Sequence, residues 1–298
     1  MENANPQQCP LCRSRDITAF KTILDHSVSG ENFQLWDCHA CGLRFTAPTP
    51  PPDRIGAYYQ SEAYISHSDT RKGFINKIYH IARDYMLGRK RRMVEAASSS
   101  RRLLDIGCGT GYFPGHLKSH GFDVVGVEVD EKARTHAREQ FGFVVHSPEV
   151  LEKGGLDGPF GVITLWHVLE HLHDPHLYLD RAAALLPKGG ILLIAVPNFT
   201  AFDAQWYGAL WAGYDVPRHL WHFRPDTLIT LVKGHGFELK NQKRLPLDPF
   251  YVALLSEKYR GAGVLGMLRA FLVGLWSSLK SWMDTKNSSS IVYIFEKK

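Results

Sequence analysis

The sequence has no apolar run of the roughly 18 or more residues that a membrane-spanning helix needs. Its first ten residues include neither a basic nor an apolar segment, so they do not read as a secretory signal. Five cysteines in a chain of 298 residues are too few for a disulfide-stabilised scaffold. Together these absences predict a soluble protein of the cytoplasm.

The chain also lacks a strong charge of either sign, because 35 Lys and Arg against 30 Asp and Glu leave a net charge of +5. Proteins that work on nucleic acid usually concentrate much more positive charge, so nucleic acid is not the partner we expect. A hydrophobic fraction of 44% is enough for a full core. The length predicts about two domains.

Four of the five cysteines lie in two CxxC motifs: Cys9 with Cys12, and Cys38 with Cys41. Each motif turns the chain so that both thiolates face one point, and two such turns make a tetrahedral site suited to Zn²⁺. A redox CxxC normally occurs singly and beside a βαβ unit, so the pair favours structural zinc. Residues 1–50 are therefore predicted to form a zinc-ribbon-like module.

The proline-rich stretch 46–52 predicts a stiff linker and a domain boundary. Apolar residues at helical spacing over about 72–97 then predict a helix, so residues 51–100 are expected to be a linker and an N-terminal helical cap. The basic run 89–92 on that helix is interpreted as a solvated face, with an RNA-binding patch as the alternative.

From residue 101 strands alternate with helices, which predicts an α/β fold with a Rossmann-like, doubly wound, seven-stranded sheet. The domain is expected to span 101–298, with insertions at about 199–225 and 246–290. The first strand runs into an acid and three glycines: Asp105, Gly107, Gly109 and Gly111. These glycines allow a tight turn and close approach of a ligand. Tyr112 stands where a dinucleotide-binding motif would have its third glycine, so that motif fails.

The second strand ends at Glu128, about 20 residues past the glycine loop, where a carboxylate can accept hydrogen bonds from both ribose hydroxyls of a nucleoside. With LLDIGCGTGYF, VVGVEVD, ITLWHVLEHLHDP and LLPKGGILLIAVPN, residues 100–298 resemble the class I S-adenosylmethionine-dependent methyltransferases. The resemblance implies S-adenosylmethionine as cofactor. It also implies this set of cofactor-binding residues: Asp105, Gly107, Gly109, Gly111, Glu128, Val129, His146 and Leu165.

The sulfonium methyl of such a cofactor is already activated, so the protein mainly aligns a nucleophile and excludes water. A hydroxyl or carbon acid must also lose a proton, for which a histidine is suited. His167 follows the fourth strand, where α/β sheets place their chemistry, and is the first candidate base. The alternative is a hydrogen-bonded wall residue.

The run from His167 to His171 is also similar to the ExxEH run of ubiquinone-type O-methyltransferases, which is associated there with a divalent metal. His167 replaces the first Glu of that run, which leaves metal dependence open. The other interpretation is that Glu170 and His171 form a buried, mutually bonded pair.

An aromatic-rich stretch, 206–223, follows the fifth strand. Its aromatics could stack on a sugar or ring, and Arg218 could bind an anionic group. Asp215 and His219 are the second candidates for acid–base catalysis. The alternative is a packed cap with satisfied polar groups.

The paired CxxC motifs, this fold and the run DVPRHLWHF together look like bacterial methyltransferases of sugar and cell-surface metabolite pathways. We therefore expect O- or C-methylation of a small-molecule, sugar or lipid-linked acceptor. An RNA methyltransferase that binds RNA through its zinc module is one alternative. A non-catalytic binding protein is another, and the intact Asp105 and Glu128 argue against it.

Leucines and a tryptophan recur at steps of three and four within 261–283, which predicts a helix: Leu265, Leu268, Leu272, Leu275, Leu279 and Trp282. The other face of this helix is apolar too, and such a helix must be covered. The first expectation is the protein's own cap or a homodimer partner. The second is peripheral contact with the inner membrane surface or a lipid-linked acceptor, aided by nearby basic residues.

Overall fold

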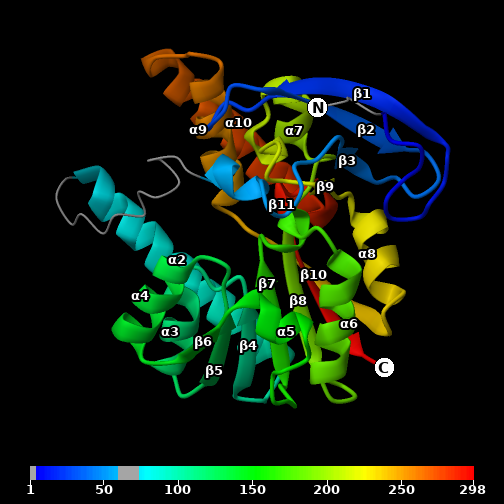
Figure 1. Ribbon diagram of the computed structural model, residues 1–298. Coiled ribbons are helices and arrows are strands. Elements are labelled where there is room, and N and C mark those ends of the chain that lie inside the picture. Colours follow the sequence, from blue (N-terminus) through cyan, green and yellow to red (C-terminus); the bar gives the residue numbers. More distant parts are fainter. Residues whose placement is uncertain (1–4, 60–73) are drawn as a thin grey trace.

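Residues 5–59 and 74–298 are described by the computed structural model, with two sheets and the helices that cover them (Figure 1). The strands are β1 Ile17–Leu24, β2 Asn32–Cys38, β3 Arg44–Thr46, β4 Arg102–Ile106, β5 Asp123–Val127, β6 Val144–His146, β7 Val162–Trp166, β8 Ile191–Pro197, β9 Trp221–His222, β10 Phe237–Arg244 and β11 Ser290–Lys297. The α-helices are α2 Phe74–Ala97, α3 Tyr112–Lys118, α4 Glu131–Phe141, α5 Pro148–Glu152, α6 Pro175–Leu185, α7 Phe202–Tyr207, α8 Pro225–Lys233, α9 Asp248–Tyr259 and α10 Val264–Met283. Short 3₁₀ helices are η1 Ile55–Tyr59, η2 Leu169–His171, η3 Gly208–Leu210, η4 Ala212–Tyr214 and η5 Thr285–Asn287.

The large sheet has seven strands in the order β10-β11-β8-β7-β4-β5-β6. Its central pairings are parallel, and β11 runs antiparallel to both β8 and β10. Every residue of β7 is buried, as expected for a strand covered on both faces. The predicted seven-stranded α/β sheet is confirmed.

The core lies on both faces of this sheet. On one face Leu104, Ile163 and Ile194 pack in a cluster that includes side chains of α5, α6 and α8. On the other face Leu103 and Val162 pack in a cluster with side chains of α2, α3 and α4. Alternate strand residues thus enter opposite cores, which is the doubly wound arrangement.

The small sheet has the order β1-β2-β3-β9. Its first three strands come from residues 17–46, and the fourth comes from the insertion after β8, where Phe45 pairs with Trp221. Cys9 and Cys38 lie in the same core cluster as residues of the large sheet. The N-terminal segment therefore shares a sheet with the 199–225 insertion. The stretch 46–52 does not act as a spacer between the N-terminal segment and the rest of the chain.

Arg218 ties these two parts together. Its side chain is 1% exposed and donates to the carboxylates of Asp25, from the N-terminal segment, and of Asp215. It also donates to the carbonyl of Tyr58. Because these acceptors occupy the guanidinium, the expectation that Arg218 binds an anionic ligand was wrong.

The predicted helices at about 72–97 and within 261–283 are present as α2 and α10. Residues 60–73, which belong to the predicted linker and cap, lie outside the described residues. Among the helices that the structure describes, none combines the length and apolar character needed to cross a bilayer.

Candidate active site

Most of the functional candidates lie at or just after the carboxyl ends of β4, β5, β6 and β7. In the register of the sheet, Ile106 at the end of β4 lies between Val127 of β5 and Leu165 of β7. Val127 pairs in turn with His146 at the end of β6. The loops after these parallel strands therefore emerge side by side, as in other open α/β sheets.

The glycine loop connects β4 to α3. Gly107 has φ 72° and Gly111 has φ 87°, a region that favours glycine. A Cβ at Gly107 would meet Val168 at 2.3 Å, and one at Gly111 would meet Ala137 at 2.6 Å. A Cβ at Gly109 would meet nothing within 4 Å among the described atoms. A side chain at Gly107 or Gly111 would thus clash with the protein, whereas Gly109 has open space beside it, although its φ of 54° also favours glycine.

Glu128 links the ends of β4 and β5. Its Oε2 accepts the Gly109 N–H at 2.8 Å, and its Oε1 accepts the Asp130 N–H at 3.0 Å. These two bonds fix the half-buried carboxylate beside the glycine loop. The next residue, Val129, is exposed, and Asp130 begins α4 by accepting the Ala133 N–H.

Asp105 lies in β4, two residues before Gly107, and is buried. The Thr164 hydroxyl of β7 donates to its carboxylate. Burial raises the pKa of Asp105 to about 7, although Thr164 and the ammonium of Lys90 favour the charged form. Asp105 can therefore change protonation state near neutral pH.

The other predicted cofactor residues lie at the same edge. His146 is half-buried at the end of β6, and its carbonyl accepts the Glu128 N–H at 3.0 Å. The Leu165 side chain is buried in the hydrophobic core. Trp166 and His167 follow Leu165 at the end of β7, where the Trp166 ring lies near the Lys90 Nζ and His167 lies near Asp248. No contact tests these assignments, and they stay predictions.

His167 has φ 57°, which is rare for a residue with a side chain. Its Nδ1 lies 3.4 Å from Glu170 Oε1, and its Nε2 lies 3.4 Å from Asp248 Oδ2. Burial alone would lower the pKa of His167, but the two carboxylates outweigh it and raise the pKa to about 9. His167 is therefore an imidazolium at neutral pH, held between two acids.

Two residues of this site were missed by the sequence reasoning. Asp248 begins α9 in the second insertion, and Lys90 belongs to the basic run of α2. The Lys90 Nζ lies 4.3 Å from the centroid of the Trp166 ring and 5.7 Å from that of Phe113. Burial lowers the pKa of Lys90, although Asp105 and Asp248 oppose that shift. Part of the basic run thus faces the site and is not a solvated helix face.

Glu170, His171 and His219 bring one carboxylate oxygen and two ring nitrogens within 4.8 Å of one another. His171 Nδ1 lies 3.0 Å from the Arg218 carbonyl, and His219 Nδ1 lies 2.9 Å from the Gly213 carbonyl. If both Nδ1 atoms donate, both Nε2 atoms keep a lone pair. In the described part of the chain neither carboxylate oxygen of Glu170 accepts a hydrogen bond.

This donor set is one that a divalent transition-metal ion accepts. Glu170 and His171 do not form the mutually bonded pair that was the alternative interpretation, since the contacts of His171 are the Arg218 carbonyl and the Tyr59 hydroxyl at 3.0 Å. The metal dependence that the sequence left open at this run stays open.

Asp215 and His219 share a segment but not a hydrogen bond between side chains in the described structure. Asp215 accepts from Arg218 through both carboxylate oxygens, at 2.6 and 3.0 Å. His219 is buried, and its ring centroid lies 4.6 Å from that of His171. His219 thus belongs with Glu170 and His171 in space, and its catalytic role and that of Asp215 stay predictions.

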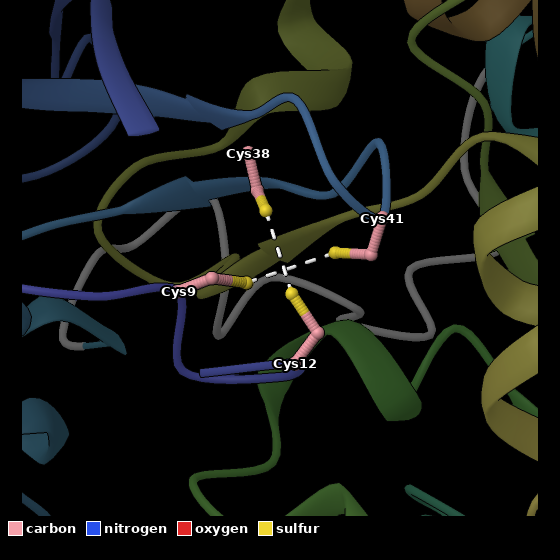
Figure 2. Close-up of side chains that lie close together, drawn as sticks. All are labelled: Cys9, Cys12, Cys38 and Cys41. Carbon is pink, nitrogen blue, oxygen red and sulfur yellow. Dashed lines mark hydrogen bonds between the residues drawn. The ribbon is translucent and has the colours of Figure 1, made fainter. Parts of the chain in front are cut away.

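The four N-terminal cysteines converge on one point from two turns of the chain (Figure 2). The Sγ atoms of Cys9 and Cys41 are 3.7 Å apart, and those of Cys12 and Cys38 are 3.5 Å apart. A tetrahedral zinc site with Zn–S distances of about 2.3 Å has sulfurs about 3.8 Å apart. The described geometry therefore fits the predicted metal.

Comparison with known proteins points to one family. A family model for a methyltransferase domain matches residues 79–242, more than half of the chain. Ubiquinone biosynthesis O-methyltransferase of Caulobacter sp. (strain K31) is 36% identical over 162 residues, which are 50% of this chain and 64% of that protein. The relative from Maricaulis maris (strain MCS10) is 32% identical over 163 residues, 50% of this chain and 63% of its own. The chain thus spans less than two thirds of the length of these relatives.

Two solved structures share the fold. Magnesium protoporphyrin IX methyltransferase from Synechocystis PCC 6803 with bound SAH has a TM-score of 0.51 at 12% identity, covering 83% of this chain and 94% of that one. A SAM-dependent methyltransferase from Thermotoga maritima has a TM-score of 0.51 at 20% identity, covering 76% and 96%.

The fold, the glycine loop and these matches define a class I S-adenosylmethionine-dependent methyltransferase. The chain belongs to the methyltransferase domain family. The resemblance stated from the sequence motifs is confirmed.

Proposed function

We propose that this protein transfers a methyl group from S-adenosylmethionine to a small-molecule acceptor, at oxygen. The observation that carries the proposal is the Glu128 carboxylate, fixed against the open Gly109 position by two backbone N–H groups. An acid held there suits the ribose of a nucleoside cofactor. The O-methyltransferase relatives favour oxygen as the acceptor atom.

The residues present fit this cofactor. Glu128 would accept from the ribose hydroxyls, and the loop from Gly107 to Gly111 would lie against the methionyl part. Asp105 would bind an ammonium through its buried carboxylate. When bound, S-adenosylmethionine supplies an activated methyl group, so the protein's own task is to orient the acceptor and manage its proton.

His167 and Lys90 would bind the acceptor oxygen. The Lys90 Nζ lies near Trp166 at the end of β7, where Asp248 favours its charged form, and His167 lies beside the Asp248 carboxylate. An imidazolium and an ammonium stabilise an acceptor oxygen that is losing its proton. His167 acts as the base itself only in its neutral form, which its raised pKa of about 9 confines to alkaline pH.

Cofactor binding is tested by calorimetry of the purified protein with S-adenosylmethionine, its demethylated product and a nicotinamide dinucleotide. We expect the first two to bind and the third not to bind. Small molecules released from the purified protein, identified by mass spectrometry, would then supply acceptor candidates for a methyl-transfer assay. Binding of neither adenosyl compound would overturn the proposal, and transfer to RNA alone would replace the acceptor class.

We also propose that Cys9, Cys12, Cys38 and Cys41 hold one structural Zn²⁺. The spacing of their sulfurs supports a closed tetrahedral site with no position left for a substrate. Elemental analysis of protein purified without chelator should find one zinc per chain. Absence of zinc, or its retention after Cys9 and Cys12 are both replaced by serine, would contradict the assignment.

A further inference from the structure

Helix α10 turns its large apolar side chains outward. We name this surface, with two neighbours on α9, the α10 ridge: Tyr251, Leu254, Val264, Leu265, Met267, Leu268, Phe271, Leu272, Leu275, Trp276, Leu279, Trp282 and Met283. The α10 members are 40–83% exposed. The stripe of leucines and Trp282 predicted from the sequence lies on this exposed surface, and no described residue covers it. An apolar patch of this extent on a single chain marks an interaction surface.

The opposite side of α10 explains why the helix is held in place without its large side chains. Its buried residues are small or medium: Gly266, Ala270, Val273, Gly274, Ser277 and Ser281. A Cβ at Gly274 would meet Phe250 of α9 at 2.7 Å, so the two helices approach closely. The Ser277 hydroxyl donates to the buried carboxylate of Asp203 at 2.8 Å. The inward side of α10 is therefore packed against the protein, and the α10 ridge is left exposed to a partner.

The charges that border the ridge are mostly positive. Lys258, Arg260 and Lys286 are exposed, and Lys280 is half-buried near the end of α10. Of the acids on these helices and the following turn, Asp248 faces His167, Glu257 is buried and paired with Arg260 and Arg269, and Asp284 is exposed. An excess of basic residues around an apolar surface is complementary to anionic headgroups.

The same charges disfavour a second copy of the chain, because a symmetric dimer through the ridge would bring like charges together. Trp276 and Trp282 are half or more exposed, and tryptophan is the side chain that membrane interfaces favour. Since no described helix can cross a bilayer, a helix of this kind lies along the surface.

We infer that the α10 ridge docks the protein on the surface of an anionic lipid bilayer, with α10 lying along the headgroup region. The docking surface is continuous with the candidate active site, because α9 begins at Asp248, which faces His167. The two helices pack along each other (Figure 1). The bilayer would thus lie against the same helical pair that supplies a carboxylate to the site.

The experiment is co-sedimentation of the full-length protein with vesicles of phosphatidylcholine, with or without phosphatidylglycerol. We expect the protein to pellet with the phosphatidylglycerol vesicles, less so at high salt. Leu272→Glu should lower vesicle binding by about tenfold or more, because a charged side chain replaces a leucine that the bilayer would cover. Ile81→Glu is the matched control, since Ile81 is an exposed apolar residue of another helix, α2.

Two further measurements keep the outcomes distinct. The thermal midpoint of Leu272→Glu should equal that of the parent protein. If this variant does not fold, Leu265→Glu takes its place in the vesicle assay, because Leu265 is 82% exposed. Analytical ultracentrifugation gives the oligomeric state of the parent and both variants. Protein that stays in the supernatant with both vesicles overturns the inference. So does a parent dimer that either variant splits without a change in vesicle binding.

Discussion

Replacing Arg218 by methionine tests how the N-terminal segment is held on the methyltransferase domain. The substitution removes the guanidinium that bonds both Asp25 and Asp215 while keeping much of the side-chain volume. Asp25 is fully buried, so its carboxylate would lose the paired Arg218 charge and keep the hydrogen bonds that it accepts from Ser27, Val28 and Ser29. Breaking a buried ion pair by removing one partner costs about 3–5 kcal/mol, and we expect the free energy of unfolding to fall by that amount.

Urea denaturation followed by tryptophan fluorescence measures this change. Arg92→Met is the control, because Arg92 is exposed on α2 and its replacement should change the free energy of unfolding by less than about 0.5 kcal/mol. Adding Asp25→Asn and Asp215→Asn to Arg218→Met should recover part of the loss, since no uncompensated charge then remains. A fall in the free energy of unfolding of less than about 1 kcal/mol for Arg218→Met would mean that these ion pairs contribute no more than exposed ones. That result would refute the claim that Arg218 holds the N-terminal segment in place.

Glu128→Ala should weaken S-adenosylmethionine binding by about 1.5–3 kcal/mol, because the ribose hydroxyls lose a charged acceptor; unchanged affinity in calorimetry would remove the assignment. Cys12→Ser should lower the zinc content from one per chain and also the thermal midpoint of the whole chain, since β3 pairs with β9; a loss of zinc with an unchanged midpoint would contradict that coupling. The pKa of His167 is raised from 6.5 to about 9, so its ion pairs stabilise the folded state fully below about pH 6.5 and progressively less as the pH rises through 9. The stability difference between the parent and His167→Gln should therefore shrink over that range, and a difference independent of pH would contradict the raised pKa. If His167 is the base, turnover should increase toward pH 9, whereas a rise centred near 6.5 would exclude it.

Local signals predicted the large sheet well. Buried strands such as β7 are short apolar runs bounded by turn residues. The glycine loop was recognised from the spacing of its three glycines after an acid. Glu128 was found because the acid at the end of the second strand has a fixed place relative to that loop. These features depend on neighbours in the chain, which a single sequence displays.

Contacts between distant segments were not predictable in the same way. Asp248 faces His167 from an insertion whose path no local pattern specifies, and Lys90 stood in a basic run that resembled a solvated helix face. The small sheet was missed as a joint structure because β9 has two residues and no strand signal of its own. Helix α10 was predicted as a helix, but which side of it is buried was not predicted. Its buried side is formed mostly by small residues, which a pattern of hydrophobic residues does not reveal.

The pairing of β3 with β9 has a consequence for how the chain reaches its native state. The Thr46 hydroxyl and His222 are hydrogen-bond neighbours although 176 positions separate them along the chain. During synthesis the N-terminal strands emerge long before the strand that completes their sheet, so β3 remains an open edge in the meantime. Metal binding at the two cysteine turns can proceed in that interval, because all four ligands precede residue 42. The proposed zinc could therefore bind before β9 is synthesised, and a nascent chain stalled before residue 221 would present the four cysteines together with an unpaired β3.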